Sequence, residues 1–318
     1  MPKVSIIVPV YGVEKFIERC ARSLFEQTLD DIEYLFIDDC TPDKSIEILK
    51  NVLEEYPHRK NQVIIHRMEK NSGQAAVRKW GILNATGDYV IHCDSDDRVD
   101  VTMYEKMYNK AIEEGSDIVV CDYVETDGVS DKIVIEYYSC KNNEFVHSVL
   151  TKKTHSSVWN KLVRQDLYEK PIVYPKDNNA EDYALLSQLS YYCTIVSKVN
   201  EPLYYYFFNP LSITKISTKE HLISRFEQSY ANIKLAESFL LARGVYNNYL
   251  KELDYIKTNE KILLLPYVGD KVVLDVWRSH FKEVFPRMMF NPILSIRDKI
   301  RYITTKFGAY PIVKHFLK

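Results

Sequence analysis

The stretch HCDSDDRV, residues 92–99, gathers side chains that could do chemistry, because Asp94, Ser95, Asp96 and Asp97 follow one another without a break. The apolar segment before it predicts a buried strand. Adjacent carboxylates repel each other, and desolvating them is costly unless a positive charge lies among them. Since Mg²⁺ and Mn²⁺ prefer oxygen ligands, a divalent metal site is favoured here over a solvated turn.

A calcium-binding EF-hand loop is an alternative that the sequence tests directly. A loop starting at Asp94 would need a ligand at its fifth position and a glycine at its sixth, where Arg98 and Val99 stand. A predicted strand, rather than a helix, also precedes the acids. The EF-hand is therefore excluded, and a ligand site at the carboxyl end of a strand in an open sheet remains.

Acidic residues also end the second predicted strand and begin a later helix. Asp39 stands where a carboxylate can accept a hydrogen bond from a base N–H or a ribose hydroxyl. Glu181 and Asp182 open the helix predicted over 179–192. Acids in the first turn of a helix are favoured by its dipole, so this pair taken alone indicates no catalytic role.

Flat and basic side chains stand near other predicted strand ends. Pro9 and Tyr11 close the first strand, as turn residues or as a floor for a flat base. Arg78 lies one to two turns into a helix that Gly73 opens. Its guanidinium could pair with a diphosphate or with a neighbouring acid, and the sequence leaves both open.

The predicted strands and helices that must position these residues alternate regularly in the first 130 residues. Such alternation predicts a mostly parallel sheet with helices on both faces. With nine glycines and no GxGxxG or GxxxxGK[ST], the dinucleotide-binding and P-loop folds are excluded. The expected strands are 4–11, 32–39, 62–68, 89–94 and 117–124, and the expected helices are 14–27, 43–55, 73–85 and 101–114.

Beyond residue 130 the pattern becomes less regular. Strands are predicted at 133–138, 194–199 and 202–208, around the helix at 179–192. From Lys219 onward the periodicity predicts helices alone, at 219–243, 246–265 and 270–284. We therefore expect a sheet domain over 1–215 and a helical region over 216–318.

Bulk properties narrow the function classes. With 318 residues, 46% of them hydrophobic, the chain can bury a sizeable core. A formal net charge of −2 argues against a nucleic-acid binder. The six cysteines include no CxxC pair and predict reduced thiols, which suits a cytoplasmic protein. We find no run of about 18 apolar residues, so no spanning helix is expected.

The C-terminal tail differs in charge from the rest. Residues 287–318 carry seven basic residues against one acidic residue, a net +6 in a chain whose total is −2. Ile296, Ile300, Ile303 and Phe307 recur at helical spacing within it. This pattern is typical of a basic amphipathic helix on an anionic membrane surface, and equally of a packing helix with a solvated basic face.

The order of four segments, VSIIVPVY, IDDCTPDKS, NSGQAAVRKWG and TGDYVIHCDSDD, resembles the family 2 glycosyltransferases of the GT-A fold. The resemblance is dense over residues 3–130. It continues at VWNKLVRQDLY, NNAEDYALLSQL and LYYYFFNPLSIT, and it does not cover the last hundred residues. Motifs in this order and spacing are specific, which an isolated Asp-x-Asp is not.

The resemblance implies a role for each matching position. Pro9, Tyr11 and Asp39 would bind the nucleotide, usually a uracil nucleotide, and Arg78 would lie near the phosphates. Asp94 and Ser95 would face the ribose and sugar, and Asp96 would bind Mn²⁺ or Mg²⁺. Asp182 would be the general base. The acceptor side would include Asp97, Trp159, Lys161 and Glu181.

Several positions depart from the family pattern. Gly12 and Lys79 stand where asparagine is usual, Cys40 and Ala180 where glycine is usual, and Phe207 where arginine is common. The last change puts a phosphate contact in doubt. None of them removes a carboxylate that the mechanism needs.

We therefore expect an α/β GT-A enzyme that transfers a hexosyl or N-acetylhexosaminyl group from a nucleotide-diphosphate sugar, with inversion, in cell-surface polysaccharide or glycoconjugate biosynthesis. The acceptor would be a saccharide or lipid-linked saccharide, with the enzyme on the inner membrane face. A catalytically degenerate nucleotide-sugar-binding scaffold of the same fold is the alternative. A nucleotidyltransferase ranks lower, because its usual glycine-rich N-terminal loop is missing.

Overall fold

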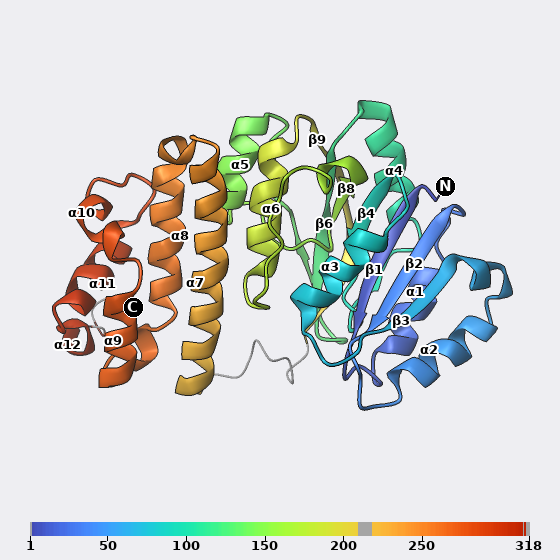
Figure 1. The fold of residues 1–318 in the computed structure, drawn as a ribbon, viewed down its shortest axis with the longest axis horizontal. Coiled ribbons are helices and arrows are strands. Elements are labelled where there is room, and N and C mark those ends of the chain that lie inside the picture. The colour runs from blue at the N-terminus through green and yellow to red at the C-terminus, as the bar shows by residue number, and fades with distance from the viewer. Residues whose placement is uncertain (1, 209–217, 314, 316–318) are drawn as a thin grey trace.

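The computed structural model describes residues 2–208, 218–313 and 315. A twisted sheet flanked by helices forms one side of the molecule, and a group of helices forms the other (Figure 1). The two ends of the chain lie at opposite sides of this arrangement. The expected α/β class with a helical C-terminal region is confirmed.

The N-terminal half of the sheet is parallel, in the order β3-β2-β1-β4. The strands are apolar nearly throughout, because helices shield both faces. The carboxyl ends of β1, β2 and β4 therefore meet at one edge. The elements are β1 (Val4–Val10), α1 (Ile17–Phe25), β2 (Ile32–Asp38), α2 (Ser45–Glu54), β3 (Val63–Arg67), α3 (Gln74–Asn84), β4 (Tyr89–His92) and α4 (Met103–Glu114).

The other half of the sheet is mixed. β8 (Lys161–Arg164) runs antiparallel between β4 and β6 (Ile118–Thr126). β9 (Val196–Phe207) runs parallel to β6 and joins the two strands predicted at 194–199 and 202–208, with register shifts beside Asp122. The short strands β5 (Arg98–Val99) and β7 (Asp131–Val134) pair antiparallel with β9 and β6.

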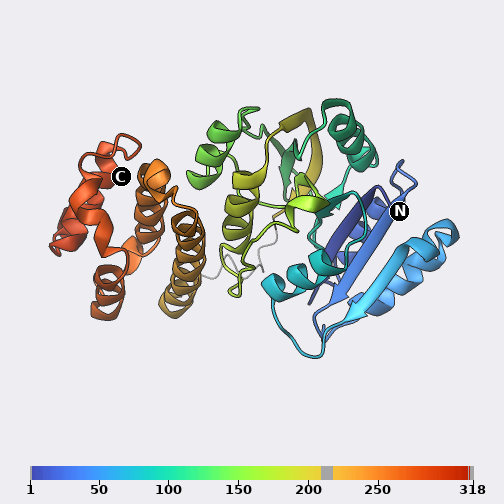
Figure 2. The same ribbon diagram turned by 45° about the horizontal axis from the view of Figure 1, so that its top comes forward.

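The helical region builds its own apolar core. α7 lies between α6 and α8 in both views (Figures 1 and 2). Its core includes Val146 and Leu150 of α5 and Tyr183 of α6, so it reaches back under the sheet domain. The boundary expected at 215–216 falls outside the described residues. The helices are α5 (Asn142–Leu150), α6 (Glu181–Tyr192), α7 (Lys219–Ala242), α8 (Leu250–Ile262), α9 (Lys271–Ser279), α10 (Phe285–Met288), α11 (Ile296–Lys306) and α12 (Tyr310–Val313).

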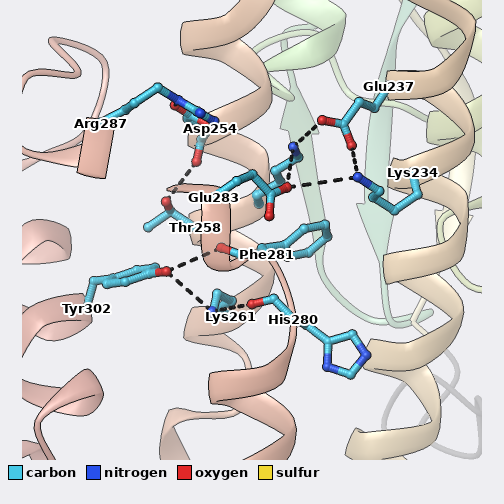
Figure 3. Close-up of polar contacts among 11 residues, drawn as sticks. Lys234, Glu237, Asp254, Thr258, Lys261, His280, Phe281, Glu283, Arg287 and Tyr302 are labelled. Atoms are coloured by element: carbon cyan, nitrogen blue, oxygen red, sulfur yellow. Dashed lines mark hydrogen bonds and ion pairs between the residues drawn. The ribbon is translucent and has the colours of Figure 1, made fainter. Parts of the chain in front are cut away.

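Charged side chains tie the helical region together (Figure 3). Lys257 is fully buried, and its Nζ lies 2.5 Å from Glu237 Oε1 of α7 and 2.9 Å from Glu283 Oε1. Arg287 donates two hydrogen bonds to Asp254 of α8. Lys257 and Asp254 are buried, so losing their partners would leave an unpaired buried charge, and this network therefore fixes the segment around α10 against α7 and α8.

The basic tail forms the predicted helix as α11. Tyr302 and Thr305 are buried against the helical core, whereas Ile296, Ile300 and Phe307 are 77%, 40% and 69% exposed. Most of the stripe that suggested an amphipathic helix thus faces outward. Within the described ranges, we find no helix long and apolar enough to cross a membrane.

Candidate active site

The candidate site lies at the edge where β1, β2 and β4 end. Asp39 directly follows β2 and is 4% exposed. Its two carboxylate oxygens accept hydrogen bonds from the backbone N–H groups of Ser72 (2.7 Å) and Gly73 (2.8 Å). Asp39 thereby fixes the loop that opens α3. A carboxylate has about four lone-pair sites, so a base N–H could still be accepted.

Gly73 is the point where three distant segments meet. Its φ of +82° lies in the left-handed region, which glycine adopts without a Cβ clash. A Cβ there would come within 2.9 Å of the Asn178 side chain, whose Oδ1 accepts the N–H of Ala75. Glycine at this position therefore favours the close approach of the segment before α6 to the first turn of α3.

Arg78 of α3 joins the acidic groups of the site. Its side chain is almost fully buried, and Nη2 lies 2.6 Å from Asp94 Oδ1 at the end of β4. Nη1 pairs with both Glu181 and Asp182 at the start of α6. Of the two partners that the sequence left open, the neighbouring acids are those that Arg78 contacts. One guanidinium thus connects the end of β4 to the first turn of α6.

Burial and neighbouring charges shift the pKa values of the two carboxyl groups of α6 in opposite directions. Burial alone would lower the pKa of Arg78, but Asp182, Glu181 and Asp94 outweigh it and raise that pKa well above its ordinary value. Burial raises the pKa of Glu181 well above its usual range. Burial also acts on Asp182, but Arg78 and the hydrogen bond from Glu181 lower the pKa of Asp182. The pair thus favours a neutral Glu181 beside an ionised Asp182, a division typical of acid–base sites.

The three acids of HCDSDDRV have different surroundings. Asp94 contacts Arg78 and accepts from Gln74 Nε2 at 3.2 Å. Asp97 is fully buried and accepts from Tyr204 Oη and from the Phe207 N–H, both at 2.6 Å. Asp96 is half-buried. Asp97 therefore anchors β9 to the loop after β4, and its contribution to the acceptor side is indirect.

A divalent metal fits this edge only with oxygen ligands from a substrate. Among the described residues, no three His, Cys, Asp or Glu side chains gather into a ready-made metal site. Mg²⁺ and Mn²⁺ are usually held by one or two carboxylates, with phosphate oxygens and water completing the shell. Asp96 and Asp94, both partly exposed, match that requirement, whereas the fully buried Asp97 does not.

The remaining residues that were predicted to bind the nucleotide sugar lie around the same edge of the sheet. Pro9 is half-buried within β1, and Tyr11 follows it with 48% of its surface exposed. Ser95 is 5% exposed, next to Asp94. A half-exposed tyrosine just after a strand end can offer a face to a flat ring, which suits the predicted nucleotide floor.

Trp159 and Lys161, which were predicted on the acceptor side, are enclosed by the fold. Trp159 is 4% exposed and stacks on Tyr204 with ring centroids 4.2 Å apart. Lys161 is fully buried, and its Nζ lies 2.7 Å from Asn160 Oδ1 and 3.5 Å from Glu136 Oε2. Burial lowers the pKa of Lys161. Side chains so enclosed position their neighbours instead of touching an acceptor.

Sequence reasoning missed the residues that hold the site together. Tyr204 Oη bonds Asp97 and also accepts the N–H of Asp94 at 3.1 Å. Glu136 accepts from Asn160 Nδ2 at 2.9 Å and from the His155 N–H at 2.9 Å. The sequence offered the cluster of tyrosines at 204–206 as a signal, which we interpreted as part of a strand and of the segment LYYYFFNPLSIT that resembles the family.

Two departures from the family pattern now have a structural description. Cys40 and Ala180 adopt φ values of +57° and +62°, where a residue with a Cβ is strained. Ala180 is the residue that precedes α6, next to the two acids of the site. The backbone thus keeps a conformation that glycine would adopt more readily.

Comparisons with known proteins identify the family of this chain. The pattern of "Glycosyl transferase family 2" matches residues 5–171. The putative glycosyltransferase EpsH of Bacillus subtilis (strain 168) is 30% identical over 275 residues, which cover 83% of this chain and 77% of EpsH. The uncharacterized glycosyltransferase EpsJ of the same strain is 33% identical over 246 residues, covering 73% of this chain and 70% of EpsJ.

Solved structures share the fold. The crystal structure of S. aureus TarS 1-349 has a TM-score of 0.67 and 17% sequence identity, covering 98% of this chain and 90% of that one. The same protein in complex with UDP also gives a TM-score of 0.67. This likeness confirms the expected GT-A fold. The family pattern over residues 5–171, with the relatives EpsH and EpsJ, establishes that this chain belongs to glycosyl transferase family 2.

Proposed function

We propose that this protein transfers a hexosyl or N-acetylhexosaminyl group from a UDP-sugar to an acceptor hydroxyl with inversion. The observation that carries the proposal is the pairing of Arg78 with both Asp94, the proposed donor-side carboxylate, and Asp182, the proposed base. Structures of TarS, which shares the fold, contain UDP and UDP-GlcNAc, and this supports a uridine donor.

Asp182 is the proposed general base. Arg78 favours its ionised form, so it can accept the proton of an acceptor hydroxyl as that oxygen attacks the anomeric carbon. The neutral carboxyl of Glu181 stays beside it as a hydrogen-bond donor. One displacement with one base gives inversion. No second carboxylate nucleophile is needed.

The donor is proposed to lie across the strand ends. Asp39 holds the base, Tyr11 and Pro9 form its floor, and Ser95 and Asp94 face the ribose and sugar. A Mn²⁺ or Mg²⁺ ion held by Asp96 would neutralise the charge that develops on the leaving diphosphate.

We further propose that α11 attaches the enzyme to an anionic membrane surface, with a saccharide or lipid-linked saccharide as acceptor. The exposed Ile296, Ile300 and Phe307 lie among the basic residues of a tail with net charge +6, which supports this attachment. A cell-surface polysaccharide pathway is supported by a relative that is 36% identical over 120 residues, the poly(ribitol-phosphate) beta-glucosyltransferase of Bacillus spizizenii (strain ATCC 23059 / NRRL B-14472 / W23).

A panel of nucleotide sugars tests the proposed donor. Purified protein is incubated with each one, with Mn²⁺ or with a chelator, and release of the nucleoside diphosphate is measured. Metal-dependent release from a UDP-sugar is expected, and Asp96→Ala should lose it. Release that is unaffected by the chelator would contradict the metal assignment. Tight UDP binding without hydrolysis or transfer would favour the degenerate scaffold instead.

A further inference from the structure

An aromatic cluster supports the surface beside the DSDD motif. Trp159 stacks on Tyr204 and Tyr206 of β9, with ring planes inclined by 17° and 14°. Tyr123 of β6 meets the same indole edge-on at 4.9 Å. Tyr204, Trp159 and Tyr123 are each at most 7% exposed, so they form a rigid base. Tyr206 and His155 are the members of this cluster that reach the surface.

Tyr206 is held next to the carboxylates. Tyr204, two residues before it, and Phe207, directly after it, both donate hydrogen bonds to Asp97. The ring of Tyr206 stacks on Trp159 with centroids 5.9 Å apart, which restricts its orientation. The charges of Asp97, Asp94 and Asp96 add to burial in raising the pKa of Tyr206 to about 12. Tyr206 therefore presents a neutral, ordered ring beside the donor carboxylates.

His155, the second surface member of the cluster, interacts electrostatically with Asp182. Its ring packs at 5.9 Å from Trp159, and its Nδ1 accepts the N–H of Ser157 at 3.3 Å. A neutral imidazole that accepts at Nδ1 carries its proton on Nε2, which can then donate to an oxygen. Desolvation and the charge of Lys161 lower the pKa of His155, so the neutral form prevails near pH 7.

We propose that Tyr206 and His155 form the acceptor-binding surface, where a pyranose ring stacks on Tyr206 while His155 Nε2 donates to one of its hydroxyls. This inference rests on the proposed function and specifies its acceptor as a saccharide. A pyranose has an apolar C–H face that packs on an aromatic ring, and its hydroxyls satisfy a donor nearby. Trp159, Lys161 and Glu136 act as positioning residues behind this surface.

The experiment measures acceptor and donor binding separately. Labelled protein, saturated with UDP and Mn²⁺, is applied to an array of pyranose-containing glycans, and UDP affinity is measured by calorimetry. Wild-type protein should bind at least one glycan. Tyr206→Leu keeps the bulk but removes the flat ring, and His155→Gln keeps a donor with a different geometry. Each should weaken glycan binding about 10-fold, the loss of one stacking or hydrogen-bonding contact, while UDP affinity stays within about two-fold.

Tyr205 provides the matched control. It belongs to the same strand but its side chain points to the other face, where Arg98 lies 3.5 Å from its ring centre. Tyr205→Leu should leave glycan binding unchanged. The inference is overturned if UDP binds normally and no pyranose glycan binds, or if glycan binding survives both Tyr206→Leu and His155→Gln. Failure to bind UDP at all would instead refute the proposed function.

Discussion

Replacement of Arg78 by methionine tests the electrostatic centre of the site. Methionine keeps the length and apolar stem of the side chain but removes its charge. With Glu181 neutral, Arg78 offsets one of the two negative charges of Asp94 and Asp182. Removing one partner of a buried ion pair typically costs about 3–5 kcal/mol. We expect Arg78→Met to lower the free energy of unfolding by that amount at pH 8.

The loss of stability in Arg78→Met should be larger at high pH than at low pH. Without Arg78, burial and mutual repulsion raise the pKa values of Asp94 and Asp182 above those of the unfolded chain. The folded variant then binds more protons than the unfolded one, so its stability falls as pH rises. The difference in the free energy of unfolding between wild type and Arg78→Met should therefore become smaller from pH 8 to pH 5. The change should be up to about 1.4 kcal/mol per pH unit for each carboxylate.

Urea denaturation at pH 5 and pH 8 measures both quantities. Arg22→Met is the matched control, since Arg22 also pairs with two acids, Glu18 and Glu55, but its side chain is 35% exposed. Its loss should cost less than about 1 kcal/mol. Arg78→Lys should give an intermediate loss in the free energy of unfolding. Its single ammonium cannot reproduce the contacts that the two guanidinium nitrogens make with separate acids. The reasoning is refuted if Arg78→Met costs no more than Arg22→Met, or if its cost is the same at both pH values.

Four further changes test other parts of the argument. Asp182→Asn should bind UDP normally in calorimetry but lower kcat about 10²- to 10⁴-fold, and wild-type turnover would place the base elsewhere. Ala180→Gly should relieve the positive φ and raise the free energy of unfolding by about 1 kcal/mol in urea denaturation, whereas a loss would contradict the strain. Burial lowers the pKa of Lys261 to about 7, so wild-type stability should rise between pH 7 and 10 relative to Lys261→Met, and parallel curves would exclude this titration. Ile296→Ser with Phe307→Ser should weaken sedimentation with anionic liposomes, and unchanged binding would exclude α11 as the membrane contact.

The sequence predicted the strands with strong patterns and missed those without them. Apolar runs of five to seven residues, such as β1 and β2, were recognised because helices cover both faces. β8 and β5 contain four and two residues, too few to show a period, and they exist because β4, β6 and β9 offer unpaired edges. Helix α5 was also missed, because its role depends on packing against α6 and α8.

The sequence identified the candidate residues, but it did not predict which of them contact one another. Asp94, Asp182 and Arg78 were each selected from their motifs. Their contact joins positions up to 104 residues apart, and it depends on Gly73 letting the segment before α6 approach α3. No local pattern encodes that approach, so the sequence left Arg78 with two possible partners.

The fold reduces the repulsion among the three carboxylates of HCDSDDRV because it gives each of them a different environment. Arg78 compensates Asp94, while two donors from β9 satisfy Asp97 inside the fold. Asp96 stays half-buried at the edge. Since desolvating adjacent carboxylates together would be costly, this separation lets the loop keep three acids at one strand end. In the proposed function, a cation and a diphosphate would meet Asp96 and Asp94, because Asp97 is fully buried and holds β9.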